Sequence, residues 1–458
     1  MNGPPRPRMD AANAALLTDL YELTMAQAYL AEGMREPAVF DLMVRRLPDS
    51  RNVLLACGLD DALAHLEALA FPPEAIESLR LLELFSEDFL GYLRSFRFTG
   101  DVHAVPEGTP VFAGEPILEV VAPLPEAQLA ETFLLNQVTF QTMVASKALR
   151  VVRAAAGRTV VDFGLRRAHG TDAGIKAARA AYVAGVHATS NVLAGRCYGI
   201  PVRGTMAHSY IQAHEDELAA FRAFASRYPE AVLLVDTYDT LEGVRNVIRL
   251  ARELGADFKI RAIRLDSGDL LVLAREARRM LDAAGLSRVG VFASGSLDES
   301  GIAGLVGAGA PVSGFGVGTR MDVSADAPSL DTAYKLVSYA GHPRMKLSSD
   351  KTTLPGRKQV VRVVRGGVAE RDVIGLHGER LEGEPLLATV MAGGRRTAEG
   401  AGSVDAARAR AARELAGLPE RIQDLGRAEP PYPVEVSPGL CTQTERLRAS
   451  LEGSVSRD

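Results

Sequence analysis

The sequence contains little cysteine and no long apolar run, and each shortage excludes a class of protein. The three cysteines, Cys57, Cys197 and Cys441, are an odd number at unrelated spacings. This count argues against a disulfide framework and favours a reducing compartment. No apolar run approaches the roughly 18–20 residues of a membrane span, and the N-terminal lead, Met1–Arg8, lacks the uncharged apolar stretch of a signal peptide. We therefore expect a soluble, cytoplasmic protein that binds no membrane.

The sequence also has no excess of positive charge. Its 458 residues contain 52 basic and 57 acidic side chains, a formal net charge of −5. Such a chain lacks the overall basic field of a nucleic-acid-binding protein. Only seven of the 52 basic residues are lysine, and arginine suits two-point recognition of anions. The length predicts two or three domains with an ample core.

Three regions are expected along the chain. Residues 1–125 form an N-terminal α/β domain, 126–348 an α/β barrel with the active site, and 349–458 a C-terminal segment that packs with the N-terminal domain. In the first region, helices are predicted over three ranges: Leu16–Glu32, which Asp19 caps and Gly33 ends, Asp60–Leu69 and Glu74–Arg97.

In the second region, short apolar runs alternate with helical patterns, as is typical of βα units around a parallel sheet. The predicted strands are Thr159–Phe163, Pro201–Thr205, Ala231–Asp236, Ile260–Asp266, Val289–Ser294 and Gly314–Thr319. Helices are predicted over Thr240–Leu254 and, after the cap Asp269, over Leu270–Ala284. We expect an irregular, TIM-like parallel α/β barrel with an additional α/β domain built from the N-terminal and C-terminal segments. A doubly wound open sheet is the alternative.

All six predicted strands end in polar or glycine-rich residues, and in a parallel barrel these ends form the active-site face. Phe163 and Arg166 follow the first strand, where a ring and a guanidinium could hold a flat anionic ring. A core phenylalanine with solvated arginines is the other interpretation. His208 follows the second strand and could be a nucleophile, proton carrier or phosphate acceptor, or merely a hydrogen-bonded polar residue. Asp266 could contact ribose or a hydrated metal, because Asp269 already explains the helix cap.

The last two predicted strands end in glycine motifs. Ser294-Gly295-Ser296 and Gly316-Val317-Gly318-Thr319 let backbone N–H groups approach a phosphate closely. Phosphate groups in barrels often lie after the final two strands. The second motif is not a dinucleotide-binding fingerprint, because the third glycine of that pattern is missing.

Several common catalytic patterns are absent from the sequence. It contains no Walker A motif, no His-Glu-x-x-His and no Gly-x-Ser-x-Gly. None of the six predicted strand ends carries lysine, which disfavours a Schiff-base aldolase, and clusters of cysteine and histidine with metal-ligand spacing are also absent.

These motifs together resemble those of the nicotinate phosphoribosyltransferases, a type II phosphoribosyltransferase family. The matching stretches, in family order, are Leu17-Thr-Asp-Leu-Tyr-Glu-Leu-Thr-Met, Phe163-Gly-Leu-Arg-Arg, Gly204-Thr-Met-Ala-His-Ser, Arg264-Leu-Asp-Ser-Gly-Asp, Ser294-Gly-Ser, Gly316-Val-Gly-Thr, Tyr334-Lys-Leu and Pro343-Arg-Met-Lys-Leu. The resemblance implies ATP-coupled, Mg²⁺-dependent transfer of phosphoribose from phosphoribosyl pyrophosphate to nicotinate. The products are nicotinate mononucleotide and pyrophosphate, on the Preiss-Handler route to NAD, and the family is usually homodimeric.

The resemblance also assigns roles to residues. Nicotinate binding is implied for Tyr21, Phe163, Arg166, Thr205 and Arg264, and binding of phosphoribose or phosphate for Ser267, Gly295, Ser296, Gly316, Gly318 and Thr319. His208 and Asp266 match the catalytic positions, His208 as the histidine that takes a phosphoryl group from ATP. The metal ligands are not identified.

Two other functions remain open at this point. A sister enzyme would use neutral nicotinamide and tend to offer a carboxylate to its amide, with Thr205 the position to inspect. A phosphate-binding barrel lyase or isomerase would need a lysine or an acid–base pair at the strand ends. A non-catalytic binding protein would not need His208 and Asp266 together.

Overall fold

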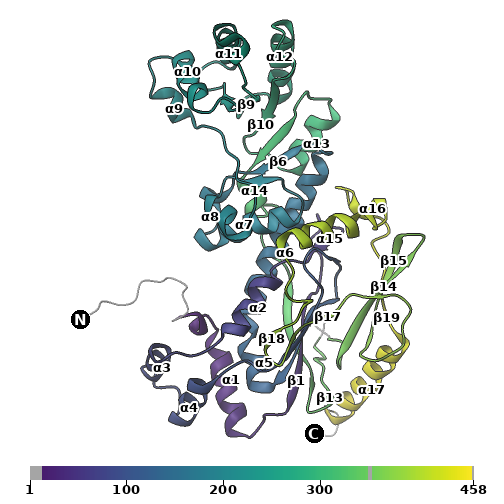
Figure 1. Ribbon diagram of the computed structural model, residues 1–458. Helices are drawn as coiled ribbons and strands as arrows, with labels where there is room; N and C mark the ends of the chain where they lie inside the picture. Colours follow the sequence, from purple (N-terminus) through teal and green to yellow (C-terminus); the bar gives the residue numbers. More distant parts are fainter. Residues whose placement is uncertain (1–12, 349–352, 456–458) are drawn as a thin grey trace. The chain divides into compact units, whose positions relative to one another are not determined.

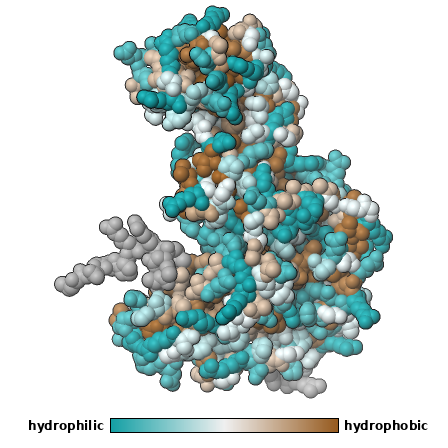
Figure 2. Space-filling model, viewed as in Figure 1, coloured by the Kyte–Doolittle hydropathy of each residue, from teal (hydrophilic) through white to brown (hydrophobic). Residues whose placement is uncertain are grey.

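The computed structural model describes residues 13–348 and 353–455. The chain divides into two compact units, one formed by residues up to Met143 together with those from Ser329 onward, the other by Val144–Pro328 (Figure 1). We call them the first and second units. Among the described residues, no helix is both long and apolar enough to cross a membrane. On the face shown in Figure 2, apolar residues form scattered patches among hydrophilic ones.

The first unit is built on mainly antiparallel sheets, with one parallel strand pair, and these sheets join both ends of the chain. Its largest sheet has the order β13-β12-β1-β5-β3-β17-β18, and β1 pairs with β12 on one side and β5 on the other. Those strands are β1 (Pro37–Val44), β3 (Asp101–Ala104), β5 (Pro116–Pro123), β12 (Thr332–Tyr339), β13 (His342–Pro343), β17 (Ala388–Ala392) and β18 (Arg395–Arg396). Two smaller sheets contain β2 (Leu54–Leu55) with β4 (Pro110–Val111), and β14 (Lys358–Arg365), β15 (Val368–Leu376), β16 (Glu384–Pro385) and β19 (Val434–Val436).

Helices accompany these sheets, and two of the helix predictions need correction. The elements are η1 (Ala14–Leu16), α1 (Leu20–Ala31), α2 (Leu59–Ala68), α3 (Pro73–Arg80), α4 (Glu87–Ser95), α5 (Leu124–Leu129), α6 (Glu131–Ala154), α15 (Val404–Ala416), α16 (Glu420–Gln423) and α17 (Pro438–Val455). The single helix predicted over Glu74–Arg97 is two, because Ser86 starts α4 by accepting a hydrogen bond from Phe89 N. Asp19 precedes α1 without capping it, since its Oδ2 accepts from Thr132 Oγ1.

The second unit contains a six-stranded parallel sheet in the order β7-β6-β11-β10-β9-β8. Its strands are β6 (Thr159–Asp162), β7 (Ala188–Thr189), β8 (Val232–Leu234), β9 (Ala262–Leu265), β10 (Gly290–Ala293) and β11 (Gly314–Val317). The helical elements are η2 (Leu165–Arg167), α7 (Thr171–Val183), α8 (Val192–Tyr198), α9 (His208–Gln212), α10 (Glu217–Arg227), α11 (Thr240–Leu254), η3 (Gly255–Asp257), α12 (Leu270–Ala283), α13 (Glu299–Gly307) and α14 (Thr319–Asp322). Asp269 caps α12 as predicted, accepting from Leu271 N and Val272 N.

The mixed α/β class with a parallel sheet is confirmed, whereas closure of that sheet into a barrel is not. In the described part of the chain, β7 and β8 form its two edges. The predicted strand Pro201–Thr205 is wrong, because that segment joins β7 by only one bridge, from Val202 to Thr189. Strand β7, which at two residues is too short to appear as an apolar run, lies between that segment and β6.

Candidate functional site

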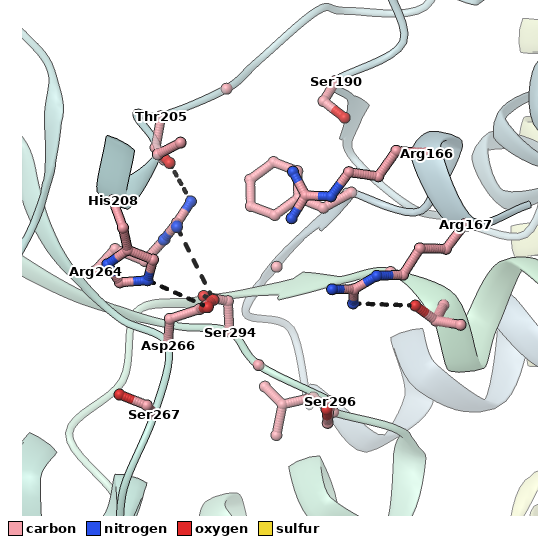
Figure 3. Close-up of a pocket in the computed structure, with 18 of the residues that line it drawn as sticks. Arg166, Arg167, Ser190, Thr205, His208, Arg264, Asp266, Ser267, Ser294 and Ser296 are labelled. Carbon is pink, nitrogen blue, oxygen red and sulfur yellow. Dashed lines mark hydrogen bonds and ion pairs between the residues drawn. The ribbon is translucent and has the colours of Figure 1, made fainter. Parts of the chain in front are cut away.

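A pocket of about 910 Å³ opens at the carboxyl ends of the parallel strands, and the second unit alone forms it. Figure 3 shows how the polar side chains converge on it. The residues that line it are Phe163, Arg166, Arg167, Ser190, Gly204, Thr205, Met206, Ala207, His208, Arg264, Asp266, Ser267, Gly268, Leu270, Ser294, Gly295, Ser296, Leu297, Gly316, Gly318, Thr319 and Arg320.

The structure places twelve of the thirteen predicted site residues in this lining. They are Phe163, Arg166, Thr205, His208, Arg264, Asp266, Ser267, Gly295, Ser296, Gly316, Gly318 and Thr319. The remaining residue, Tyr21, lies in α1 of the first unit, where its side chain interacts with Glu131.

Asp266 follows β9 and is held by hydrogen bonds from two neighbouring strand ends. Ser294 Oγ donates to its Oδ1 at 2.5 Å. Its backbone N–H donates to Asp236 Oδ2 at 2.9 Å, and the same oxygen accepts from Ser267 Oγ at 2.6 Å. Asp236 and Ser294 are both buried, so they fix the Asp266 carboxylate while a third of that side chain stays exposed to the pocket.

Arg264 lies on β9 with its guanidinium inside the pocket. Its Nη1 donates a hydrogen bond to Thr205 Oγ1, and its Nη2 lies 4.0 Å from Asp266 Oδ1 (Figure 3). Burial lowers the pKa of Arg264, and the nearby carboxylates of Asp266 and Asp236 oppose that shift. The guanidinium remains charged, because arginine is not deprotonated in proteins. It is thus a largely desolvated cation positioned for a buried anion.

His208 begins α9 and faces Asp266 across the pocket. Its Nδ1 lies 3.1 Å from Thr237 Oγ1, and its Nε2 lies 3.9 Å from Asp266 Oδ2 (Figure 3). The imidazole is 41% exposed, so Nε2 is reachable by a ligand in the pocket. A contact to one ring nitrogen fixes the ring and leaves the other free for chemistry.

The turn after β6 carries the aromatic and further cationic groups. Phe163 N donates to Val317 O at 2.7 Å, which ties this turn to β11. Arg167 Nη1 lies 3.4 Å from Thr319 Oγ1. From α14, Arg320 reaches Asp298 Oδ2 at 2.6 Å.

The lining is strongly cationic. Four arginines, Arg166, Arg167, Arg264 and Arg320, face one carboxylate, Asp266, within this part of the described chain. A pocket of one charge sign with low-dielectric walls concentrates ligands of the opposite sign. The arrangement is therefore suited to anionic substrates.

Sequence reasoning assigned no role to Asp236 or Arg320, and it gave Ser294 only as part of a phosphate-binding motif and not as a partner of Asp266. Asp236 and Ser294 stand at predicted strand ends, and this position is the signal that could have identified them. Their role emerges only from the register that puts β8 and β10 on either side of β9. Arg320 carried no signal, because one more arginine in an arginine-rich chain is not distinctive.

Gly295 is required for the backbone path between β10 and α13. Its φ is +93°, and a Cβ there would lie 2.0 Å from the carbonyl oxygen of Asp266. We expect Gly295→Ala to displace Asp266 and to lower kcat/KM roughly tenfold or more, since such strain costs about 1–3 kcal/mol. Steady-state kinetics and the Tm measure the effect. Gly304→Ala in α13 is the matched control, because no atom lies within 4 Å of its added Cβ, and equal activity of the two variants would contradict the prediction.

Comparison with known proteins agrees with this geometry. Residues 16–139 match the nicotinate phosphoribosyltransferase N-terminal domain, and residues 159–362 match the nicotinate phosphoribosyltransferase family. A nicotinate phosphoribosyltransferase of Mycobacterium tuberculosis is 54% identical over 434 residues, covering 95% of this chain and 94% of the relative. The Bacillus subtilis nicotinate phosphoribosyltransferase is 43% identical over 383 residues, covering 81% and 78%.

A solved structure gives the same result for the fold. The crystal structure of human nicotinic acid phosphoribosyltransferase matches with a TM-score of 0.84 and 30% identity, over 94% of this chain and 99% of that one. Sequence, fold and the arginine-lined pocket thus agree, and the chain belongs to the nicotinate phosphoribosyltransferase family.

Proposed function

We propose that the chain performs the reaction for which its family is named: transfer of phosphoribose from phosphoribosyl pyrophosphate to nicotinate, giving nicotinate mononucleotide and pyrophosphate. The observation that carries this proposal is the pocket lined by four arginines and one carboxylate, since both substrates are anions. A nicotinamide-using enzyme is the second candidate. The side chain at the position to inspect, Thr205, accepts a hydrogen bond from Arg264 and is not a carboxylate, which favours the acid over the amide.

In the proposed reaction, the ring nitrogen of nicotinate attacks the anomeric carbon of the ribose while the bond from that carbon to the pyrophosphate oxygen breaks. The electron pair leaves with pyrophosphate, and the nitrogen becomes a pyridinium. Arg264 and Arg166 would hold the nicotinate carboxylate, and Phe163 would pack against the ring. This fixes the nitrogen lone pair toward the ribose, so that positioning supplies much of the catalysis.

Asp266 would face the ribose. Positive charge develops at the anomeric carbon in the transition state, and a fixed carboxylate next to it is stabilising. Ser294 Oγ donates to this carboxylate, and the Asp266 backbone N–H donates to Asp236 Oδ2, so the carboxylate is held in place before the substrate arrives. The turn at Gly295 and the glycines at the end of β11, Gly316 and Gly318, would present backbone N–H groups to the phosphates.

The residues present also fit the proposed magnesium ion. Mg²⁺ is usually bound by one or two carboxylates together with substrate phosphates, and Asp266 is a carboxylate exposed to the pocket. Among the described residues no group of three or more His, Cys, Asp or Glu could form an all-protein metal site. When bound, the ion would neutralise charge on the pyrophosphate.

We further propose that ATP is a co-substrate and that His208 accepts its γ-phosphoryl group. With Nδ1–H donating to Thr237 Oγ1, the Nε2 lone pair would attack the γ-phosphorus, and the bond to the ADP oxygen would break. Hydrolysis of the phosphohistidine would return the imidazole and release phosphate. Substrate binding or product release would be coupled to this cycle.

The family resemblance supports two structural proposals as well. The parallel sheet of the second unit would correspond to an irregular barrel that pairs only loosely near Pro201–Thr205. The active protein would be a homodimer, and the resemblance assigns Tyr21 a part in binding nicotinate.

Product analysis tests the proposed function directly. The purified protein is incubated with phosphoribosyl pyrophosphate and either nicotinate or nicotinamide, with and without ATP, and nucleotides are separated by chromatography. We expect nicotinate mononucleotide and pyrophosphate in equal amounts, with ATP raising the rate. Nicotinamide mononucleotide as the main product would establish the second candidate instead.

A further inference from the structure

Behind the pocket, two aspartates that the proposed reaction does not use are buried together. Asp162 ends β6 and Asp322 ends α14, and each is 1% exposed. The register of the sheet pairs Asp162 with Val317 of the neighbouring strand, five residues before Asp322. The Asp322 carboxyl packs against Gly164, where a Cβ would lie 2.1 Å from Oδ2. The two acids thus meet beneath the turn that carries Phe163 and Arg166.

Hydrogen bonding distinguishes the two carboxyl groups. Asp162 Oδ1 accepts from Gly164 N at 2.8 Å, and its Oδ2 accepts from Thr189 Oγ1 at 2.6 Å. Neither oxygen of Asp322 receives a hydrogen bond from any donor in the described part of the chain. A buried carboxylate without a donor or a cation is costly. Protonation removes this cost, because Asp322 then donates to Asp162.

The charged groups on the surrounding elements are engaged elsewhere or face the pocket. Arg166 lines the pocket, and Arg167 lies near Thr319. Three cations form ion pairs elsewhere: Arg320 with Asp298, Lys176 with Asp172, and Lys147 with Asp326 and Glu299. Arg179 lies over the Tyr198 ring, and His187 Nδ1 accepts a hydrogen bond from Val160 N. Burial and the neighbouring Asp162 raise the pKa of Asp322 well above its usual range.

We propose that Asp322 is a positioning residue that stays protonated, and that its hydrogen bond to Asp162 fixes the nicotinate-binding turn Phe163–Arg167 against the phosphate-binding turn Gly316–Thr319. Only the expected changes in the nicotinate KM rest on the proposed function. The link works through the backbone, because Asp162 holds Gly164 N on one side while Asp322 fills the space beside the Gly164 Cα on the other.

Two substitutions at Asp322 distinguish the effect of its proton from the effect of its side-chain volume. Asp322→Asn keeps a donor to Asp162 and does not titrate, so the nicotinate KM should stay within about twofold of the wild type. Asp322→Ala removes the donor and should raise the nicotinate KM roughly tenfold, with less change in kcat. At alkaline pH the wild-type nicotinate KM should rise as the two carboxylates come to repel each other, whereas that of Asp322→Asn should not. Asp282→Asn, at a half-exposed carboxyl on α12, is the control.

Stability and spectroscopy test the same idea without using activity. A carboxyl protonated in the folded state and ionised in the unfolded state destabilises the fold progressively as pH rises above its unfolded pKa. The Tm of Asp322→Asn minus that of the wild type should therefore grow from pH 5 to pH 8. Other buried carboxyl groups, such as that of Glu115, also have a raised pKa. The infrared spectrum of the wild type minus that of Asp322→Asn should therefore contain a carboxylic-acid band at neutral pH.

The proposal is overturned if Asp322→Asn raises KM as much as Asp322→Ala, or if the Tm difference is independent of pH. It is also overturned if the infrared spectrum of the wild type minus that of Asp322→Asn contains no carboxylic-acid band. A wild type that makes no nicotinate mononucleotide would remove the proposed function instead, and the Tm and infrared results would still decide whether Asp322 holds the proton.

Discussion

Replacing Arg264 by alanine is expected to raise the KM for nicotinate roughly 100-fold, which corresponds to about 3 kcal/mol for a charge-assisted contact. The physical reason is that this guanidinium is mostly buried and already oriented by its bond to Thr205. Burial has removed most of its hydration, so a nicotinate carboxylate would replace water at low cost. The KM for phosphoribosyl pyrophosphate should change far less. Steady-state kinetics with each substrate varied in turn measure both effects.

A matched control lies three residues earlier in the chain. Arg261 is a mostly exposed arginine that pairs with Glu230, and Arg261→Ala should leave both KM values within about twofold. Arg264→Lys should fall between the alanine variant and the wild type, because lysine keeps the charge but not the two-point geometry. An unchanged nicotinate KM in Arg264→Ala, in a variant with wild-type Tm, would remove this residue from the nicotinate site.

The sequence predicts the pocket better than it predicts the sheet. The pocket lining contains, as predicted, the residues that follow Thr159–Asp162, Ala262–Leu265 and Gly290–Ala293. The reason is that parallel strands end at the same edge of a sheet, whether or not that sheet closes into a barrel. His208 was placed correctly for another reason. Its predicted strand is reduced to a single bridge at Val202, but His208 still lies in the pocket lining.

Errors arose where tertiary contacts override local pattern. Glu74–Arg97 has continuous helical spacing, yet Glu83 adopts φ +56° between α3 and α4, a conformation that no periodicity predicts. Asp19 has the type and position of a cap, but its carboxylate bonds to Thr132, which is 113 residues away. Nothing in the local pattern marks Asp322 at the end of α14, because its importance lies in Asp162, a buried neighbour on β6.

The net charge of −5 also acquires a clearer meaning. It gives no indication of a polyanionic polymer as partner, and it does not describe the pocket, where four arginines outnumber one aspartate. Exposed acidic side chains elsewhere balance this local excess. For a small anionic substrate, the local field and the orientation of its groups determine binding more than the total charge.

The second large effect is expected at His208. In His208→Ala, phosphoribosyl transfer should continue slowly, but the ratio of rates with and without ATP should fall to about one, since no other imidazole lines the pocket described to take the phosphoryl group. The imidazole would be the reacting group because it is 41% exposed and faces the pocket, while its Nδ1 lies against Thr237 Oγ1. Rates of nicotinate mononucleotide formation with and without ATP measure this ratio.

Labelling gives the direct measurement. Incubation with ATP labelled at its γ-phosphate should give an acid-labile, base-stable phosphoprotein in the wild type and none in His208→Ala. His214→Ala is the control, since His214 Nδ1 contacts the Tyr210 carbonyl at 2.8 Å and lies outside the pocket lining; it should keep both the label and the ATP stimulation. Full ATP coupling in His208→Ala would show that ATP hydrolysis does not pass through this imidazole, and would leave its contact with Asp266 as its only part in the site.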